Sequence, residues 1–468
     1  MRDLFAFIFL LIAGILLVPV LVAAIYMEFS HIPSFVLPAA ISGGIGIIFR
    51  KKYDEEGNLR LGEAMLLVAI AWVLMSGFGA VPYIISLNLG PLNAMFESAA
   101  GFTATGLTIL QGAEGWLVEV PPHSMLFWRS FTQWVGGVGV VVLFLAIIPR
   151  TGRFARLLFE SEAREERMLP RIKDTARYIY KAYLLFTILG IIGFVLGGMG
   201  LFAAVNHSMT GIATGGFSVT ADSFAGYGGP ILAVAIFLMI MGAISFALHR
   251  KAFDGNWRAL LNSWEVRLMI GLIALSALAL ALDVGIKNSI FQTTSALTGT
   301  GFSTTGLIPG DWSSFQKGVL TVLMVLGGGY GSTSSAIKLI RSIIIIGTLL
   351  WIIKRAFLPD RAIVPLKIGG VEYEEKDVME ASMYAFIYIG FLIVSSLLIM
   401  ILMPDWSGID VIFESASAQG NVGLSVGITE VAPSPVKWIL IGQMLAGRLE
   451  ILPYVALFYK ITQKIGLH

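Results

Sequence analysis

The sequence predicts an all-α polytopic membrane protein in which four pseudo-symmetric repeats surround a central pore, preceded by two extra spans. Three observations support this prediction. Of the 468 residues, 56% are hydrophobic and only 13% are charged, which is more apolar surface than a soluble globule can bury. Ten apolar stretches are each long enough to cross a bilayer, and one short pattern rich in Gly and Thr occurs four times between them.

The ten predicted spans lie at about 5–27, 34–50, 61–86, 124–148, 178–200, 228–248, 264–284, 316–350, 378–403 and 436–460. The first is too long for the apolar region of a signal peptide, so we interpret it as a membrane span. Basic clusters occupy every second connection, among them Arg50 to Lys52, Arg150 to Arg177 and Lys354-Arg355. By the positive-inside rule these connections face the cytoplasm, and the even number of spans places both termini there.

This pattern divides the chain into five parts. Residues 1–60 hold the two leading spans, and four pore repeats are predicted at 61–150, 151–260, 261–360 and 361–468. The second repeat includes the cytoplasmic connector, which fits a solvated segment and a partner-docking surface equally well. Because the chain has no cysteine and a net charge of only +2, nothing points to thiol chemistry or to a nucleic-acid partner.

Four segments align on one glycine without gaps. They read Phe96-Glu97-Ser98 … Thr105-Gly106-Leu107-Thr108, then Asn206-His207-Ser208 … Gly215-Gly216-Phe217-Ser218, then Phe291-Gln292-Thr293 … Thr300-Gly301-Phe302-Ser303, and finally Phe413-Glu414-Ser415 … Val422-Gly423-Leu424-Ser425. Each unit holds two spans, so successive units have the same orientation, unlike inverted repeats. Four such units are expected to surround an axis along the membrane normal.

The repeated loops suit a filter for a dehydrated monovalent cation. Backbone carbonyls from four loops can replace the water shell of a potassium ion, and glycine lets the four backbones converge. The stretches at about 92–103, 202–213, 287–298 and 409–420 are expected to be half-membrane helices whose C-terminal ends favour a cation. The predicted filter, with K+ at its backbone carbonyls, comprises Thr105, Gly106, Gly215, Gly216, Thr300, Gly301, Val422 and Gly423.

Close helix packing is the alternative explanation for small residues inside a membrane. We prefer it for five other glycines, Gly43, Gly44, Gly136, Gly137 and Gly139. Glu97 and Glu414 occupy equivalent positions nine residues before their glycines, and we expect buried pairing there, for instance of Glu97 with Arg129. The five histidines lack metal-ligand spacing.

The eighth predicted span is too long for one membrane crossing. From Phe315 to Leu350 a continuous helix would reach about 54 Å. Its middle is helix-poor, so we predict a broken helix whose unwound centre acts as a gate in a water-lined cavity below the filter. The alternative is a tilted continuous helix. The gate residues expected from this pattern are Gly327, Gly328, Gly329, Gly331 and Ser332.

Several longer motifs resemble the membrane subunit of Trk-type potassium uptake systems, in the wider Trk/Ktr/HKT superfamily. These motifs are Trp128 to Gly137, Leu169-Pro170-Arg171-Ile172, Gly331-Ser332-Thr333 with Ile337-Lys338, and Met444 to Glu450. The resemblance covers nearly the whole chain, and the two leading spans match the Trk branch. It implies potassium uptake across a prokaryotic plasma membrane, with K+ as the permeating ion and no organic cofactor. It also implies a homodimer in the lipid bilayer, regulated by a cytoplasmic ring of TrkA-like nucleotide-binding subunits.

The resemblance implies roles for individual residues as well. Relatives that favour sodium have serine at the position of Gly106, so its glycine matches potassium permeation. Lys338 and Arg448 fall within matching motifs and join the expected gate. Arg448 lies near the middle of the last span, where an arginine must face protein or water. Its implied role is a positive charge below the filter. The alternative is a structural ion pair; Glu450 is near in sequence, but residues two apart on a helix point in different directions.

Two functions in the same fold remain open from the sequence. A gated, channel-like potassium pore and a potassium symporter coupled to H+ or Na+ would use the same filter. An intramembrane enzyme is disfavoured, because the chain lacks Gly-x-Ser-Gly, His-Glu-x-x-His and Gly-x-Gly-Asp motifs and any paired acid and base at a plausible spacing.

Overall fold

A computed structural model of the chain describes residues 2–51, 61–110, 121–147, 172–306, 312–359, 364–368 and 370–449. Apart from one 3-10 turn, η1 (Phe29–His31), and the antiparallel two-residue strands β1 (Lys367–Ile368) and β2 (Val371–Glu372), the regular structure in this part is α-helical. Six of the described helices are long and apolar enough to cross a membrane, or seven if one bent pair counts as a span. The predicted all-α polytopic membrane fold is confirmed.

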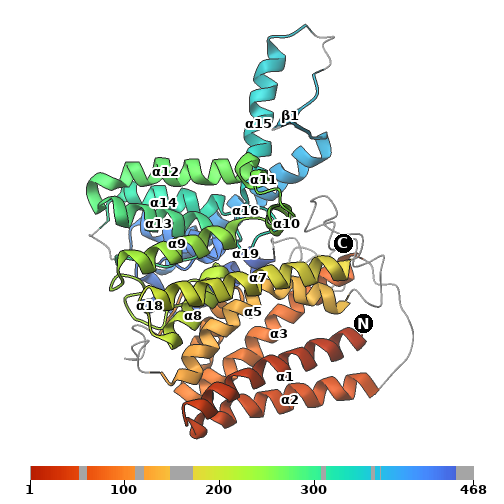
Figure 1. The fold of residues 1–468 in the computed structure, drawn as a ribbon, viewed down its shortest axis with the longest axis vertical. Helices are drawn as coiled ribbons and strands as arrows, with labels where there is room; N and C mark the ends of the chain where they lie inside the picture. Colours follow the sequence, from red (N-terminus) through yellow and green to blue (C-terminus); the bar gives the residue numbers. More distant parts are fainter. Residues whose placement is uncertain are drawn as a thin grey trace.

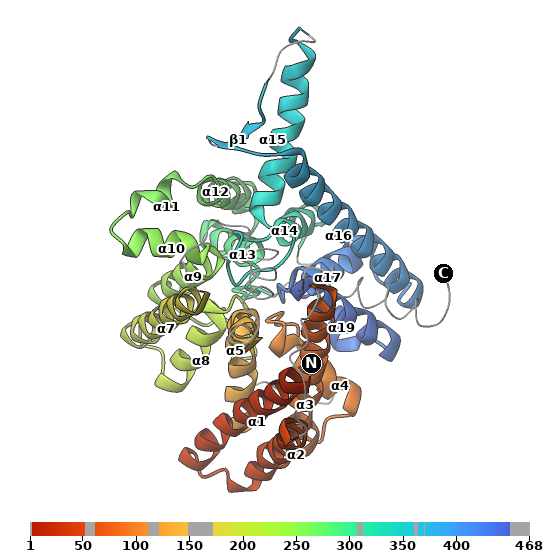
Figure 2. The same cartoon turned by 90° about the vertical axis from the view of Figure 1, so that its right-hand side faces the viewer.

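Four groups of helices form the body of the protein. Each contains a long helix, a half-helix of 12 or 13 residues and a returning helix: α3 (Leu61–Leu87), α4 (Pro91–Phe102) and α5 (His123–Ile147); α7 (Ile172–Leu196), α8 (Leu201–Ile212) and α9 (Gly229–Ala243); α12 (Trp264–Val284), α13 (Ile286–Thr298) and α14 (Ser314–Leu326); α16 (Glu375–Leu402), α17 (Gly408–Gly420) and α19 (Ser434–Arg448). Contacts of α5 with α8, α9 with α13, α14 with α17 and α19 with α4 close these groups into a ring. Figure 2 shows the four groups around a common centre.

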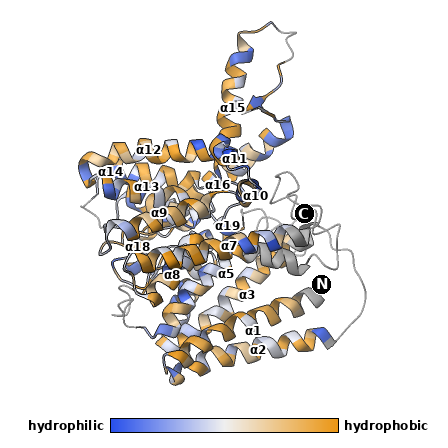
Figure 3. Cartoon of the chain, in the orientation of Figure 1, coloured by the Kyte–Doolittle hydropathy of each residue, from blue (hydrophilic) through white to orange (hydrophobic). Residues whose placement is uncertain are grey.

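The remaining helices lie around this ring. They are α1 (Arg2–Ile25), α2 (Ile32–Lys51), α10 (Phe246–Phe253), α11 (Arg258–Asn262), α15 (Leu339–Ala356) and α18 (Ile428–Val431). In Figure 1, α15 and β1 stand away from the bundle, while α1 and α2 lie side by side along the first group. Figure 3 shows apolar residues along the long helices and hydrophilic residues mostly at their ends and around β1.

The turn between α1 and α2 is fastened to the start of α5. The Glu28 carboxylate accepts hydrogen bonds from the backbone N–H groups of His123 at 2.7 Å and Ser124 at 2.9 Å. Burial alone would raise the pKa of Glu28, but hydrogen bonds from Ser124 and His123 outweigh it and place that pKa below its ordinary value. The Tyr26 ring stacks on His123 with 4.0 Å between centroids. The leading hairpin is therefore docked onto the first helix group.

Backbone contacts at glycines set how closely the helices approach. A Cβ atom at Gly136 would overlap the carbonyl oxygen of Phe102, and one at Gly137 would lie 2.7 Å from the Tyr183 hydroxyl. The packing role predicted for these two glycines is confirmed. Gly43 makes an ordinary contact, with its Cβ position 3.6 Å from the Ala13 Cβ, but Gly44 has nothing within 4 Å, so its predicted packing role is wrong. The surroundings of Gly139 lie outside the described part.

Two predicted spans are interrupted. The break predicted within 316–350 is confirmed, because α14 ends at Leu326 and α15 begins at Leu339. The span predicted at 228–248 is wrong as a continuous helix, since α9 ends at Ala243 and α10 continues at an angle of 104°. Ser245 begins α10 by accepting the N–H of Ala247, which stabilises the new direction. The end of the tenth predicted span, beyond Leu449, lies outside the described residues.

The contact at Gly447 provides a test of this packing. A Cβ atom there would overlap the carbonyl oxygen of Gln419 in α17, and a backbone atom cannot move aside as a flexible side chain can. We expect Gly447→Ala to lower the free energy of unfolding by about 1–3 kcal/mol, measured as a lower melting temperature of the purified protein in detergent. Gly442→Ala in the same helix is the matched control, because Gly442 has nothing within 4 Å. Equal melting temperatures for the two variants would contradict the assigned contact.

Candidate functional site

Four short loops meet where the half-helices end. They are loop 1 (103–110), loop 2 (213–220), loop 3 (299–306) and loop 4 (421–427). In each, the residue before the aligned glycine donates its N–H to the carbonyl five residues earlier at 2.9 Å; the pairs are Thr105 to Ala100, Gly215 to Thr210, Thr300 to Ser295 and Val422 to Ser417. The four half-helices therefore present their C-terminal ends, with their partial negative charge, to the loops in the same way.

The aligned glycines form a closed ring of backbone contacts. All four have positive φ angles, +85° at Gly106, +78° at Gly216, +85° at Gly301 and +98° at Gly423. A Cβ atom at any of them would overlap a carbonyl oxygen of the next loop: Gly106 meets Gly215, Gly216 meets Thr300, Gly301 meets Val422, and Gly423 meets Thr105. The structure thus brings together all eight residues of the predicted filter. At the four aligned positions, both the positive φ angle and the lack of space for a Cβ atom require glycine.

A polar side chain nine residues before each glycine holds the loop beyond it. We call these four the buttress residues: Glu97, His207, Gln292 and Glu414. Each is fully buried and hydrogen-bonded to the residue two positions after its glycine, with Glu97 to Thr108 at 2.9 Å, His207 to Ser218 at 2.9 Å, Gln292 to Ser303 at 2.8 Å and Glu414 to Ser425 at 2.7 Å. The gapless alignment contained this signal, because His207 and Gln292 stand at the positions of Glu97 and Glu414.

The predicted pairing of Glu97 with Arg129 is confirmed. Arg129 Nε lies 2.8 Å from Glu97 Oε1, and both side chains are buried. The same guanidinium donates to the carbonyl oxygen of Ser218 at 3.0 Å and lies 4.2 Å from the ring centroid of Phe217. Arg129 therefore joins loops 1 and 2, and removing one charge of such a buried pair typically costs about 3–5 kcal/mol.

Two further side chains support the loops and were not predicted. The Gln133 side chain donates to the carbonyl oxygen of Gly215 at 2.5 Å and accepts the N–H of Phe217 at 3.0 Å, so it spans the glycine of loop 2. Asn421 in loop 4 donates to the Thr105 hydroxyl at 2.7 Å and to the Met444 carbonyl at 2.8 Å. Gln133 belongs to the motif Trp128 to Gly137, but its partner lies too far away in sequence to be identified from spacing.

The interruption between α14 and α15 forms a compact loop, which we call the break loop (residues 327–338). It donates backbone hydrogen bonds to the interrupted end of α9: Gly329 donates to Ala243 at 2.8 Å, and Thr333 donates to Gly242 at 3.1 Å. Gly327 and Gly331 have φ angles of +72° and +68°. The break loop thus pairs with carbonyl groups that α9 leaves open, which explains why the span ends at Ala243.

This loop lies directly against the ends of two half-helices. The Thr333 hydroxyl donates to the carbonyl oxygen of Ile212 at the end of α8, at 3.0 Å. A Cβ atom at Gly299, which follows α13, would lie 3.2 Å from the Ser334 hydroxyl. A Cβ atom at Gly328 would lie 2.9 Å from the Ser334 Cβ, and one at Gly329 would lie 3.0 Å from the Ala243 carbonyl oxygen. The break loop is therefore packed tightly on the side of the four loops opposite to the start of the half-helices.

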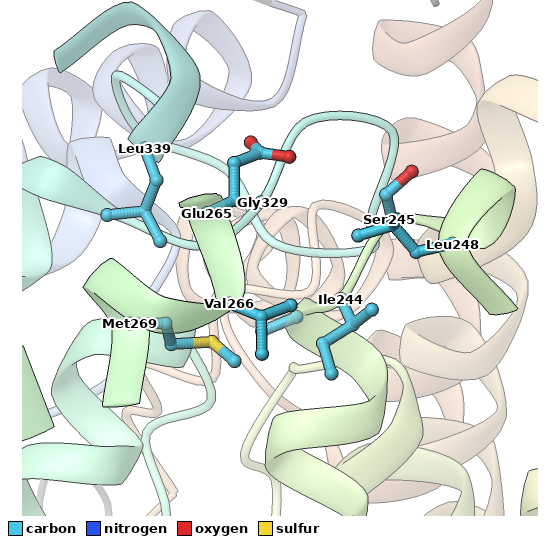
Figure 4. A pocket seen from close by; sticks show the side chains of 9 residues that line it. Ile244, Ser245, Leu248, Glu265, Val266, Met269, Gly329 and Leu339 are labelled. Atoms are coloured by element: carbon cyan, nitrogen blue, oxygen red, sulfur yellow. The ribbon is translucent and has the colours of Figure 1, made fainter. Parts of the chain in front are cut away.

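A carboxylate at the start of α12 anchors the same loop. Glu265 accepts the backbone N–H of Tyr330 at 2.9 Å and lines a small pocket with Ser245, Gly329 and Leu339 (Figure 4). The Lys338 ammonium donates to the carbonyl oxygen of Ser334, and the Ser332 hydroxyl donates to that of Gly329 at 2.6 Å. The residues predicted at the gate thus lie in one hydrogen-bonded unit, to which Glu265 belongs although the sequence offered no sign of it.

Arg448 connects the break loop to the first helix group. Its guanidinium donates to the carbonyl oxygens of Thr333 at 2.8 Å and Gly136 at 2.7 Å, and it is buried. It also lies within 3.4 Å of the Ser335 hydroxyl and 3.2 Å of the Gly137 carbonyl oxygen. The expectation that this arginine faces protein or water is met. Glu450, the acidic residue near it in sequence, lies outside the described residues.

Comparisons with known proteins agree with this architecture. Residues 39–263 and 259–465 match the profile of the TrkH family, described as cation transport proteins. The chain is 33% identical to an uncharacterized cation transporter of Methanocaldococcus jannaschii, with 94% of this chain and 91% of that one covered. It is 32% identical to the Trk system potassium uptake protein TrkH of Escherichia coli K12, with 96% of both covered.

A solved structure extends the likeness to three dimensions. The crystal structure of the potassium transporter TrkH from Vibrio parahaemolyticus matches with a TM-score of 0.83 and 28% identity, covering 97% of this chain and 98% of that one. The resemblance seen in the sequence motifs is thereby confirmed, and the chain is a multi-pass membrane protein from a family of transporters, not of enzymes. It belongs to the TrkH family of cation transport proteins.

Proposed function

We propose that this protein mediates potassium uptake through a gated, channel-like pore whose selectivity filter consists of the eight aligned loop residues. The closed ring of glycine contacts carries this proposal. The atoms nearest to each aligned glycine are backbone atoms of the next loop, so carbonyl oxygens can surround an ion that has lost its water. Four half-helices end at these loops, and their dipoles favour a cation. The potassium named for the relatives fits this chemistry.

The break loop and Arg448 form the proposed gate. The loop packs against the ends of α8 and α13, directly below the proposed filter, where it obstructs a permeating ion. Its residues bond to α9, to Glu265 and to Arg448, so a movement of any of these partners changes the position of the loop. A guanidinium at this depth also opposes cations electrostatically, because one unit charge contributes about 4 kcal/mol at close range with an effective dielectric near 20.

We also propose the assembly and orientation that the motifs imply: a homodimer in a prokaryotic plasma membrane, regulated by a TrkA-like ring, with both termini in the cytoplasm. The projection of α15 and the hairpin beyond the bundle supports a docking role (Figure 1). The last turn of α15 contains Lys354 and Arg355, which the positive-inside rule places on the cytoplasmic side. The division into two leading spans and four repeats, with boundaries near 60, 150, 260 and 360, remains a prediction.

Rubidium uptake into proteoliposomes tests the conduction proposal directly. Vesicles with the purified protein should accumulate Rb+ along its own gradient, with no sodium or proton gradient imposed. The reversal potential should follow the potassium gradient alone. A requirement for a sodium or proton gradient would replace the channel-like pore with coupled symport in the same fold.

Gly106→Ser tests the filter. A side chain at Gly106 would press on the Gly215 carbonyl and displace one oxygen of the ring, so we expect a lower permeability of K+ relative to Na+. The measurement is the bi-ionic reversal potential in planar bilayers. Gly90→Ser is the control, because Gly90 precedes α4 in the same repeat and has nothing within 4 Å. A Gly106→Ser protein with unchanged relative permeability would argue against the filter alignment.

Arg448→Gln tests the gate. Removing the guanidinium frees the Thr333 carbonyl and removes a positive charge below the proposed filter, so Rb+ flux should increase while the K+/Na+ ratio stays the same. Arg448→Lys separates the contribution of the charge from that of the hydrogen bonds, since lysine keeps the charge but cannot reproduce the paired donors of the guanidinium. Reduced or unaltered flux in a well-folded Arg448→Gln protein would return this residue to a purely structural role.

A further inference from the structure

The four buttress residues share one geometry but not one charge. His207 and Gln292 carry no negative charge, and the charge of Glu97 is balanced by Arg129 at 2.8 Å. Glu414 differs, because none of the described lysine, arginine or histidine side chains forms an ion pair with it. Loop 4 therefore has a buried carboxylate behind it without a positive partner in the described part of the chain.

The partners of Glu414 favour its ionised form. Its two oxygens accept the Ser425 hydroxyl at 2.7 Å, the N–H groups of Val426 and Thr429 at 3.0 Å each, and the Thr429 hydroxyl. Burial is the largest influence on this carboxylate and opposes ionisation, and the four donated hydrogen bonds act against it by favouring the charged state. A charge in such a site is poorly screened by solvent and salt, so it acts on an ion nearby more strongly than a surface charge would.

The position of Glu414 relates this charge to one end of the proposed pore. It holds Ser425 and Val426, which lie two and three residues beyond Gly423, where loop 4 runs back along the middle of α17 toward the face on which the half-helices begin. We call this face the outer face. The Lys437 side chain of α19 bonds to Asn93 of α4 at 2.7 Å, so these two helices are fastened together near their starts. Glu414 thus lies behind the stretch that an ion passes on its way between this face and the ring.

We propose that Glu414 attracts the permeating cation to the outer end of the filter and so determines the apparent affinity for potassium. This proposal rests on the proposed function and goes beyond it, since it assigns affinity to one buttress residue and selectivity to the glycine ring. Glu97 occupies the equivalent position in loop 1 but contributes no net charge there, because its ion pair with Arg129 cancels it. The four loops are accordingly equivalent in backbone geometry and unequal in electrostatic potential.

Glu414→Gln removes the charge with little change in shape. The chain offers a precedent, because Gln292 holds Ser303 from the equivalent position in loop 3. We expect the KM for Rb+ uptake into proteoliposomes to rise about threefold to tenfold, which corresponds to about 0.7–1.4 kcal/mol. Vmax and the K+/Na+ permeability ratio should stay at the wild-type values. Glu414→Asp, which keeps the charge, should restore most of the affinity.

Glu430→Gln is the matched control. Glu430 is a half-buried carboxylate in α18, which directly follows loop 4, and among the described residues its side chain makes no hydrogen bond or ion pair with that loop. The KM of this variant should remain within about twofold of the wild type, since a charge that reaches solvent is screened. An equal rise in KM for Glu430→Gln would mean that general surface charge, rather than Glu414, sets the affinity.

Other outcomes also overturn the proposal. An unchanged KM in folded Glu414→Gln would show that the carboxylate is protonated or too distant to act. A lower Vmax with altered K+/Na+ selectivity would show that Glu414 only maintains loop geometry. Potassium-dependent thermal stabilisation of the purified protein gives a second measure of affinity, which applies even if the variant conducts poorly. Absence of Rb+ flux in the wild-type protein would instead refute the proposed function, so the two failures are distinguishable.

Discussion

The tightest packing constraint in this protein is the contact between the backbones of four loops at the centre of the bundle. Each of the aligned glycines presses against a carbonyl of the next loop, and a side chain at any one position would separate the loops. This contact determines what surrounds it. The half-helices must end at the same depth, the returning helices must close into a ring, and every loop must be held from behind by a buried polar group. A shift of any one loop would therefore disturb its contacts with the two loops beside it.

The local parts of this arrangement could be predicted from the sequence. Gly106 and its three equivalents were identified because the spacing of a half-helix, a glycine and a Ser or Thr recurs without gaps. The break after Leu326 was predictable because successive glycines and small polar residues have poor helix propensity. The pairing of Glu97 with Arg129 followed from the cost of an isolated charge inside a membrane. In each case the determining physics acts within a few residues or on single charges.

The remaining features depend on distant partners. Gln133 and Asn421 support loops 2 and 1 through bonds to residues that are 82 and 316 positions away, and no periodicity reveals such partners. Glu265 is an ordinary acidic residue in the first turn of a helix until the break loop folds onto it. Gly44 shows the opposite error, since a small residue on an apolar helix indicates close packing only when another helix is present opposite it. The interruption at Ile244 likewise requires an outside donor.

That interruption ties two broken helices together. The carbonyls of Gly242 and Ala243 receive their hydrogen bonds from the break loop instead of from the next turn of their own helix. If the loop withdraws, these oxygens lose their donors in the interior of a membrane protein, where an unsatisfied carbonyl is costly. Either water enters to replace the lost donors, or α9 continues through Ile244 and straightens its 104° bend. Displacement of the break loop is therefore coupled to hydration or to helix growth in α9, and the bent conformation of α9 is held by hydrogen bonds that the break loop donates.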